Sequence, residues 1–184
     1  MAVSRVSRIQ LRRLRPLLAL AACACVATTT GCGTVDTMPI PKTVAAGNNA
    51  AAGDVLIRNV FVLGPAPGQA VAAGGAAPLF VSLVNDGRAP DRLIRVTAPS
   101  VARSATIEGG GLDAPVNRLV PGGPVPRIML DKLVRPLSGN GSVRVTLTFR
   151  DAGTVSVDAP VMTATGPFTT FSPSPGPAAT PGKS

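Results

Sequence analysis

The chain has 184 residues, with 18 lysines and arginines against 9 aspartates and glutamates, and it contains no histidine, tryptophan or tyrosine. This length suits one small domain. The absence of histidine excludes imidazole metal ligands, histidine proton shuttles and the Ser-His-Asp triad.

The first thirty residues have the pattern of an export signal. Five arginines and no acidic residue precede Pro16, and an apolar stretch, Leu17–Ala27, follows. This stretch is shorter than the roughly 20 apolar residues that a membrane-spanning helix needs, so it predicts a secretory signal peptide. An uncleaved N-terminal anchor is the alternative.

Cys32 resembles the lipid-modified cysteine that follows the lipobox of bacterial lipoproteins. Cleavage before it would make residues 1–31 the signal peptide and Cys32 the acylated N-terminus of the mature chain. Cys23, after Leu20–Ala22, matches the usual lipobox better but leaves a very short apolar core. Cleavage without lipid attachment is a third possibility. We predict lipidation at Cys32, which places the protein, exported and lipid-anchored, on the outer face of the plasma membrane.

The two ends of the mature chain have a composition typical of unfolded segments. Residues 32–53 are rich in Ala, Gly, Asn, Thr and Pro without periodicity, and they predict a flexible tether. Residues 164–184 are rich in proline, which cannot donate within a sheet, and they predict a disordered tail. The 13 basic side chains left after signal removal are scattered, without a basic run or an aromatic platform, which argues against a nucleic-acid partner.

The segment between these ends, 54–163, is predicted to be all-β. In its clearest strand, Val143–Arg150, Val143, Val145, Leu147 and Phe149 alternate with polar residues, a period of two typical of a half-buried antiparallel strand. Short strands separated by turn signals predict an antiparallel β-sandwich. The other expected strands are Val55–Leu63, Leu79–Val84, Asp91–Thr97, Ala105–Glu108, Val116–Val120, Arg127–Leu130 and Thr154–Val157.

Both halves of this segment resemble a known family. The residues that carry the resemblance are Ile57–Val62, Leu79–Gly87, Asp91–Leu93, Ile128–Leu130, Val145–Phe149 and Ala152–Val155. They are similar to the PCuAC-type periplasmic copper chaperones. The order of signal, lipid-type cysteine, tether and domain resembles actinobacterial surface lipoproteins related to that family. The resemblance covers about residues 54–163 and implies a cupredoxin-like sandwich.

The resemblance also implies where copper ligands would lie. The family holds copper through His and Met, including a His-x-Met pair that reads Arg127-Ile128-Met129 here. Another family histidine falls at or near Glu108. Cu(I) favours two or more soft ligands, and the predicted domain offers only Met129 and Met162. We therefore predict that the copper site is not retained, with Met129 a weak candidate ligand that more often fills a core.

No catalytic set is recognisable in the sequence. Glu108 and Asp113 are candidates for paired carboxylates, although the three glycines between them are typical of a polar loop. The favoured function is a non-enzymatic binding or structural module of the cell envelope. It has no cofactor, and its partners are the plasma membrane, through the lipid, and an envelope protein or polymer. The alternative is a copper chaperone or metal-handling protein with altered ligands. An enzyme of unrecognised type is a third hypothesis.

Overall fold

The computed structural model describes residues 47–176, which consist mainly of β-strands. Within this range no helix is long and apolar enough to cross a membrane. The elements, in chain order, are β1 (Asn48–Ala52), β2 (Val55–Leu63), β3 (Ala70–Val71), β4 (Ala77–Asn85), β5 (Asp91–Thr97), β6 (Ala102–Ile107), the 3-10 helix η1 (Glu108–Gly110), β7 (Leu112–Ala114), β8 (Leu119–Val120), β9 (Ile128–Leu133), β10 (Leu137–Ser138), β11 (Ser142–Phe149), β12 (Thr154–Met162) and the 3-10 helix η2 (Gly166–Thr170).

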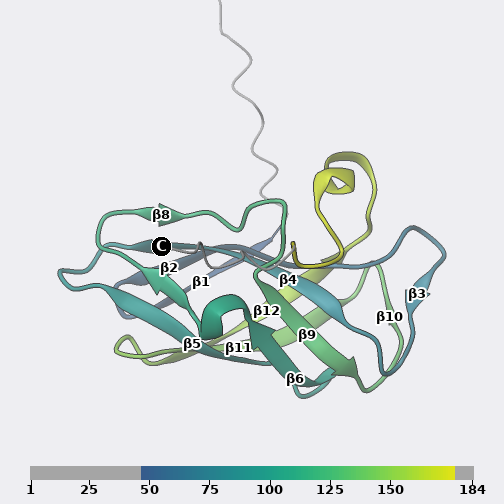
Figure 1. The fold of residues 1–184 in the computed structure, drawn as a ribbon, viewed down its shortest axis with the longest axis horizontal. Helices are drawn as coiled ribbons and strands as arrows, with labels where there is room; N and C mark the ends of the chain where they lie inside the picture. Colours follow the sequence, from purple (N-terminus) through teal and green to yellow (C-terminus); the bar gives the residue numbers. More distant parts are fainter. Residues whose placement is uncertain (1–46, 177–184) are drawn as a thin grey trace, which may run out of the picture. The chain divides into compact units, whose positions relative to one another are not determined.

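The strands form a sandwich whose two layers are joined by one parallel pair (Figure 1). The hydrogen-bonded order is β6-β9-β4-β2-β12-β11-β5-β7, with β1 beside β2 and β8 beside β4. Neighbouring strands are antiparallel except β2 and β12, which pair in parallel through Val62 with Val161 and Leu63 with Met162. β3 and β10 form a separate small ribbon. The all-β sandwich predicted from the sequence is confirmed.

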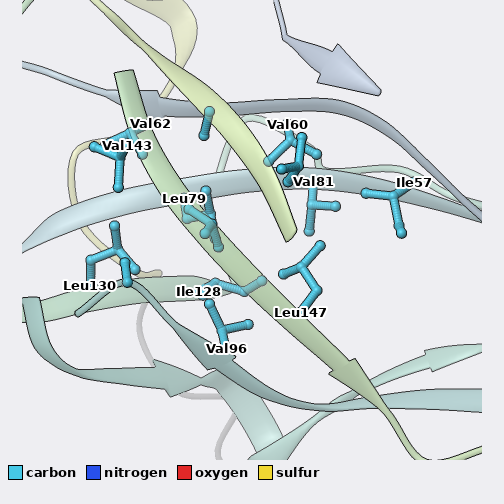
Figure 2. Packing of buried hydrophobic residues seen from close by; sticks show 14 of the residues in the cluster. Ile57, Val60, Val62, Leu79, Val81, Val96, Ile128, Leu130, Val143 and Leu147 are labelled. Atoms are coloured by element: carbon cyan, nitrogen blue, oxygen red, sulfur yellow. The ribbon is translucent and has the colours of Figure 1, made fainter. Parts of the chain in front are cut away.

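The space between the layers is filled by aliphatic side chains. Figure 2 shows side chains of β2, β4, β5, β9 and β11 directed into one common core. The four apolar residues expected to share one face of β11 are all buried, and their polar neighbours face outward. On that outer face the Arg144 guanidinium donates two hydrogen bonds to the Asp158 carboxylate across the β11–β12 pair. Each fully buried Leu or Val contributes about 1.5–3 kcal/mol, so this core supplies most of the driving force for folding.

β2 contains a bulge, and the residues that follow the bulge are buried on both faces of the sheet. Asn59 adopts a positive φ of 54°, and the pairing with β4 shifts register between Arg58 and Phe61. Beyond the bulge Val60 and Val62 point into the core between the layers. Phe61 points the other way, into an aromatic cluster that we define as Phe61, Phe80, Phe168 and Phe171.

Both end predictions were wrong where the structure describes them. The expected tether, 32–53, includes β1, which pairs along β2 because its backbone amides and carbonyls complete that strand's ladder. The expected disordered tail, 164–184, is folded over residues 164–176. There η2 places Phe168 and Phe171 against Phe61, and this apolar burial outweighs the proline content. The predicted signal peptide 1–31, the lipidation residue Cys32 and residues 177–184 lie outside the described residues.

Several strand predictions need correction, since β4, β9 and β12 run past the ends of the expected strands Leu79–Val84, Arg127–Leu130 and Thr154–Val157. The expected strand Val116–Val120 is reduced to the two-residue β8, and β7 precedes it at Leu112–Ala114. Asn117 has a positive φ of 52°, which interrupts an extended strand at that point. The expected strand Ala105–Glu108 starts earlier and ends at Ile107, because Glu108 begins η1.

Asp91, the first residue of β5, is a buried carboxylate that joins two backbone segments, the start of β5 and the β11–β12 turn. It is 6% exposed and accepts hydrogen bonds from the amides of Arg92 (2.6 Å), Asp151 (3.1 Å) and Ala152 (2.8 Å). Burial alone would raise the pKa of Asp91, but these donors and the nearby Arg150 guanidinium outweigh it, and the net effect lowers the pKa of this carboxyl. The carboxylate thus fixes the β11–β12 turn against β5.

We expect Asp91→Asn to reduce the free energy of unfolding by about 1–3 kcal/mol at pH 7, since a charged acceptor of three backbone amides is lost. Because the native pKa of Asp91 is lowered, its stabilisation is complete above the ordinary pKa of about 3.9 and is lost as the pH falls through the native value. Urea unfolding at pH 7, 5, 4 and 3 should show the difference from the natural chain shrinking below about pH 4. The exposed Asp86→Asn is the control, and a difference independent of pH would contradict this account.

Candidate functional site

The positions that the resemblance assigns to copper ligands come together where β6 pairs with β9. Ile107 lies opposite Ile128, and Thr106 lies opposite Met129. Glu108 follows β6 directly, and its amide donates a 2.8 Å hydrogen bond to the carbonyl of Arg127, the residue before β9. The register of one antiparallel pair thus brings Glu108, Arg127 and Met129, which are separated by up to 21 positions in the sequence, into one neighbourhood.

Glu108 and Arg127 form an ion pair at this place. Arg127 Nε lies 3.4 Å from Glu108 Oε2, and their side chains are 40% and 60% exposed. An exposed pair of this kind stabilises a protein by less than about 1 kcal/mol, so its contribution to folding is small. Its chemical effect is larger, because a guanidinium offers no lone pair to a metal and its positive charge opposes an approaching cation. The carboxylate is a hard ligand that Cu(I) does not favour.

Met129 does not fill the core, contrary to the expectation from the sequence. Ile128 and Leu130 of β9 are buried, whereas Met129 and Asp131 are only partly buried. Side chains alternate along a strand, so Met129 projects from the outer face, on the same side as Arg127. Beside it the Thr106 hydroxyl donates a 2.7 Å hydrogen bond to Asp131. The thioether is therefore near the Arg127–Glu108 ion pair but has no second soft donor next to it among the described residues.

The second methionine of the domain is too far away to share a metal ion with Met129. Met162 lies at the end of β12, and β4 and β2 separate β12 from β9 in the sheet. Three interstrand spacings of about 4.8 Å put the two strands roughly 14 Å apart. Both sulfur atoms cannot reach one ion across that distance. Over residues 47–176 no three side chains of His, Cys, Asp or Glu are grouped as metal ligands. The donors that this part of the chain places around Met129 do not fit a Cu(I) site.

The candidate pair of carboxylates, Glu108 and Asp113, is divided between two arginines. Glu108 pairs with Arg127, and Asp113 on β7 pairs with Arg92 of β5. Arg92 also donates a 3.0 Å hydrogen bond to the carbonyl of Gly109, so it holds η1 against β5. Each carboxylate is compensated by its own cation, an arrangement typical of structural ion pairs rather than of an acid–base couple. The sequence could not show the Glu108–Arg127 pairing, because only the β6–β9 register creates it.

The comparisons with known proteins agree with this fold. The sequence model of the LpqE-like lipoproteins matches residues 55–161, more than half of the chain. The protein belongs to the LpqE-like lipoprotein family. A comparison with curated protein sequences gives no match.

Solved PCuAC domains share the architecture of this family member. The copper-bound PCuAC domain from PmoF2 is 25% identical, with a TM-score of 0.53 over 63% of this chain and 98% of that domain. The apo PCuAC domain from PmoF1 is 22% identical, with a TM-score of 0.54 over 63% of this chain and 99% of that domain. The resemblance to PCuAC domains, and with it the cupredoxin-like sandwich, is confirmed.

Proposed function

We propose that this LpqE-like protein is an exported, lipid-anchored binding module that engages another protein of the cell envelope and performs no catalysis. The observation that carries the proposal is the Arg127–Glu108 ion pair, which stands where PCuAC proteins are expected to hold copper. At positions where the resemblance implies copper ligands, this protein has a cation and an anion. Exposed charged groups of this kind are suited to contacts with other proteins. The separate pairing of Asp113 with Arg92 supports the non-catalytic part of the proposal.

Crosslinking in intact cells tests the binding function. A photoreactive amino acid placed at exposed apolar positions distributed over the domain, Ile94, Leu119 and Val134, should yield a discrete crosslinked species from at least one position. Buried Leu147 is the matched position that should yield none. Failure of every exposed position to capture a partner above the level of Leu147 would overturn the proposal.

Copper handling is the second candidate function, and the similarity to a copper-bound PCuAC domain favours it. Titration of the mature chain, residues 32–184 with the Cys32 thiol acylated, with Cu(I) in competition with a chelator separates the two candidates, because the thiols of Cys23 and Cys25 would themselves bind Cu(I). The binding-module proposal expects no stoichiometric capture of Cu(I). Tight one-to-one binding that Met129→Ala abolishes would establish metal handling instead. Met162→Ala is the control, because Met162 lies roughly three strand spacings of about 4.8 Å from Met129.

We expect Cys32→Ala to release the chain from the membrane fraction, because acyl chains on that thiol supply the anchor. Intact-mass measurement of the natural chain should show the mass of residues 32–184 plus its acyl chains. Cys23→Ala is the matched control and should leave both the mass of the mature chain and its membrane attachment unchanged. A mature chain that starts at Cys23, or one without lipid, would contradict the assignment of Cys32.

A further inference from the structure

An open hollow is lined by residues of β5 and β6, together with Gly110 of η1. β6 lies at one end of the strand order, and β7 covers β5 only along Asp91–Leu93. A tight turn connects β5 to β6, with the amides of Val101 and Ala102 both bonded to the carbonyl of Ala98. Within the described part of the chain, however, β5 and β6 form no ladder with each other. Two strand edges therefore border the same space without a strand between them.

The hollow has an apolar floor that is continuous with the core. Its volume is about 310 Å³, and Val96, Ala105 and Ile107 are among the residues that line it. Val96 is buried, and Ala105 and Ile107 are half-buried and pack against the main core. A side chain that enters from outside would thus contact the same apolar surface that stabilises the fold. That size lies at the lower end of the range for ligand sites.

A bulge in β5 places an isoleucine at the mouth of this hollow. Leu93 pairs with Phe149 and Arg95 pairs with Thr148, so Ile94 is the extra residue between two successive pairs. Ile94 lines the hollow and is 45% exposed. Bulges at sheet edges re-aim single side chains and occur preferentially beside functional sites. The side chain is therefore available for contact with a molecule that enters the hollow.

The charge beside the hollow is positive. Arg95 lines it, Arg103 lies on β6, and neither side chain forms an ion pair within residues 47–176. An unpaired strand edge accepts an added strand through its backbone groups, and side-chain pockets then select the sequence. Charged side chains on an edge hinder the addition of strands that cannot compensate them. The complement of this edge is therefore an extended segment that carries acidic residues.

We propose that the hollow between β5 and β6 docks an extended, acidic segment of a partner protein, with one apolar side chain seated against Ile94. This inference rests on the proposed binding function and assigns the place at which the partner makes contact. The added strand would pair with the free edge of β5 or β6, and its acidic residues would face Arg95 and Arg103.

Displayed random heptapeptides, selected on the immobilised full-length chain, provide the probe for this site. We expect enriched peptides to alternate β-branched with acidic residues. On binding, they should slow hydrogen exchange at the amides of residues 94–97 or 103–107. Ile94→Asp should weaken the binding of an enriched peptide at least tenfold. Val134→Asp is the matched control, because Val134 is also 45% exposed but does not line the hollow.

A second variant tests whether the weaker binding of Ile94→Asp results from loss of the docking site or from misfolding. Ala105→Trp fills the hollow from β6 and should weaken binding to a similar extent, while urea unfolding shows that the variant is folded. No enrichment, protection at other strands, or binding that neither substitution changes would overturn the docking site. Crosslinks in cells through Leu119 or Val134 alone would also overturn it but would leave the binding function intact, whereas absence of any crosslink would contradict the binding function itself.

Discussion

The double substitution Glu108→His with Arg127→His is expected to create a Cu(I) site where β6 pairs with β9. The β6–β9 register places positions 108 and 127 side by side, and Met129 follows on the same face of β9 at about 6.6 Å along the strand. Two imidazoles and one thioether would then replace the ion pair, and such a set suits copper. We expect affinity in chelator competition to rise on the order of a hundredfold, given that single groups around a bound metal commonly contribute 10–100-fold.

The matched control moves the same chemistry to another ion pair. Arg144→His with Asp158→His replaces an exposed Arg–Asp pair on the β11–β12 face. Met162 is the nearest methionine in sequence to that pair, and it lies four residues beyond Asp158 at the C-terminal end of β12. This control should gain little Cu(I) affinity. Equal gains in both double variants, or no gain in either, would mean that the Arg127–Glu108 position is not a replaced copper site.

Phe168→Ala is expected to cost about 3–5 kcal/mol of unfolding free energy, the usual range for a buried aromatic side chain. Phe168 is 8% exposed, and its ring lies 5.5 Å from that of Phe61 in an edge-to-face arrangement. Its removal leaves a cavity over the outer face of β2 and β4 and weakens the attachment of η2. Urea unfolding at neutral pH measures the loss. Thr169→Ala, on the same short helix but exposed, should change stability by less than about 0.5 kcal/mol.

The outcome for Phe168 also tests whether residues 164–176 belong to the domain. If they do, a chain that ends after Thr163 should be destabilised at least as much as Phe168→Ala, because it loses both Phe168 and Phe171. A loss below about 1 kcal/mol for either change would mean that the C-terminal segment only rests on the sheet.

The sequence pattern was sufficient to predict a strand and its buried side where one face of the strand is exposed to solvent and the other faces the core. β11 shows this clearly, because Val143, Val145 and Leu147 alternate with polar residues and the alternation predicts both the strand and its buried side. β2 and β5 also have the predicted bounds. The alternation fails beyond Asn59, where the residues of β2 are apolar on both faces, and such runs indicate a strand covered on both sides. The prediction of a disordered tail did not use this signal, which together with Phe168 and Phe171 is the one that would have indicated a covering segment.

The candidate site could be predicted only in part, because it depends on pairing between strands. Resemblance singled out Glu108, Arg127 and Met129, but the Glu108–Arg127 contact follows from the β6–β9 register, which no local pattern encodes. The hollow beside Ile94 depends in the same way on two strands that diverge after their turn. A local sequence pattern specifies which residues are extended. Long-range packing decides which edges stay open.

The parallel pairing of β2 with β12 bears on the timing of folding. Val62 and Val161 are partners, so joining the two layers closes a loop of roughly 100 residues, and the entropy of that closure must be lost before the contact stabilises anything. A chain that lacks β12 cannot join the two layers of the sandwich in this way. The topology thus delays closure of the domain until nearly all of its residues are available to fold.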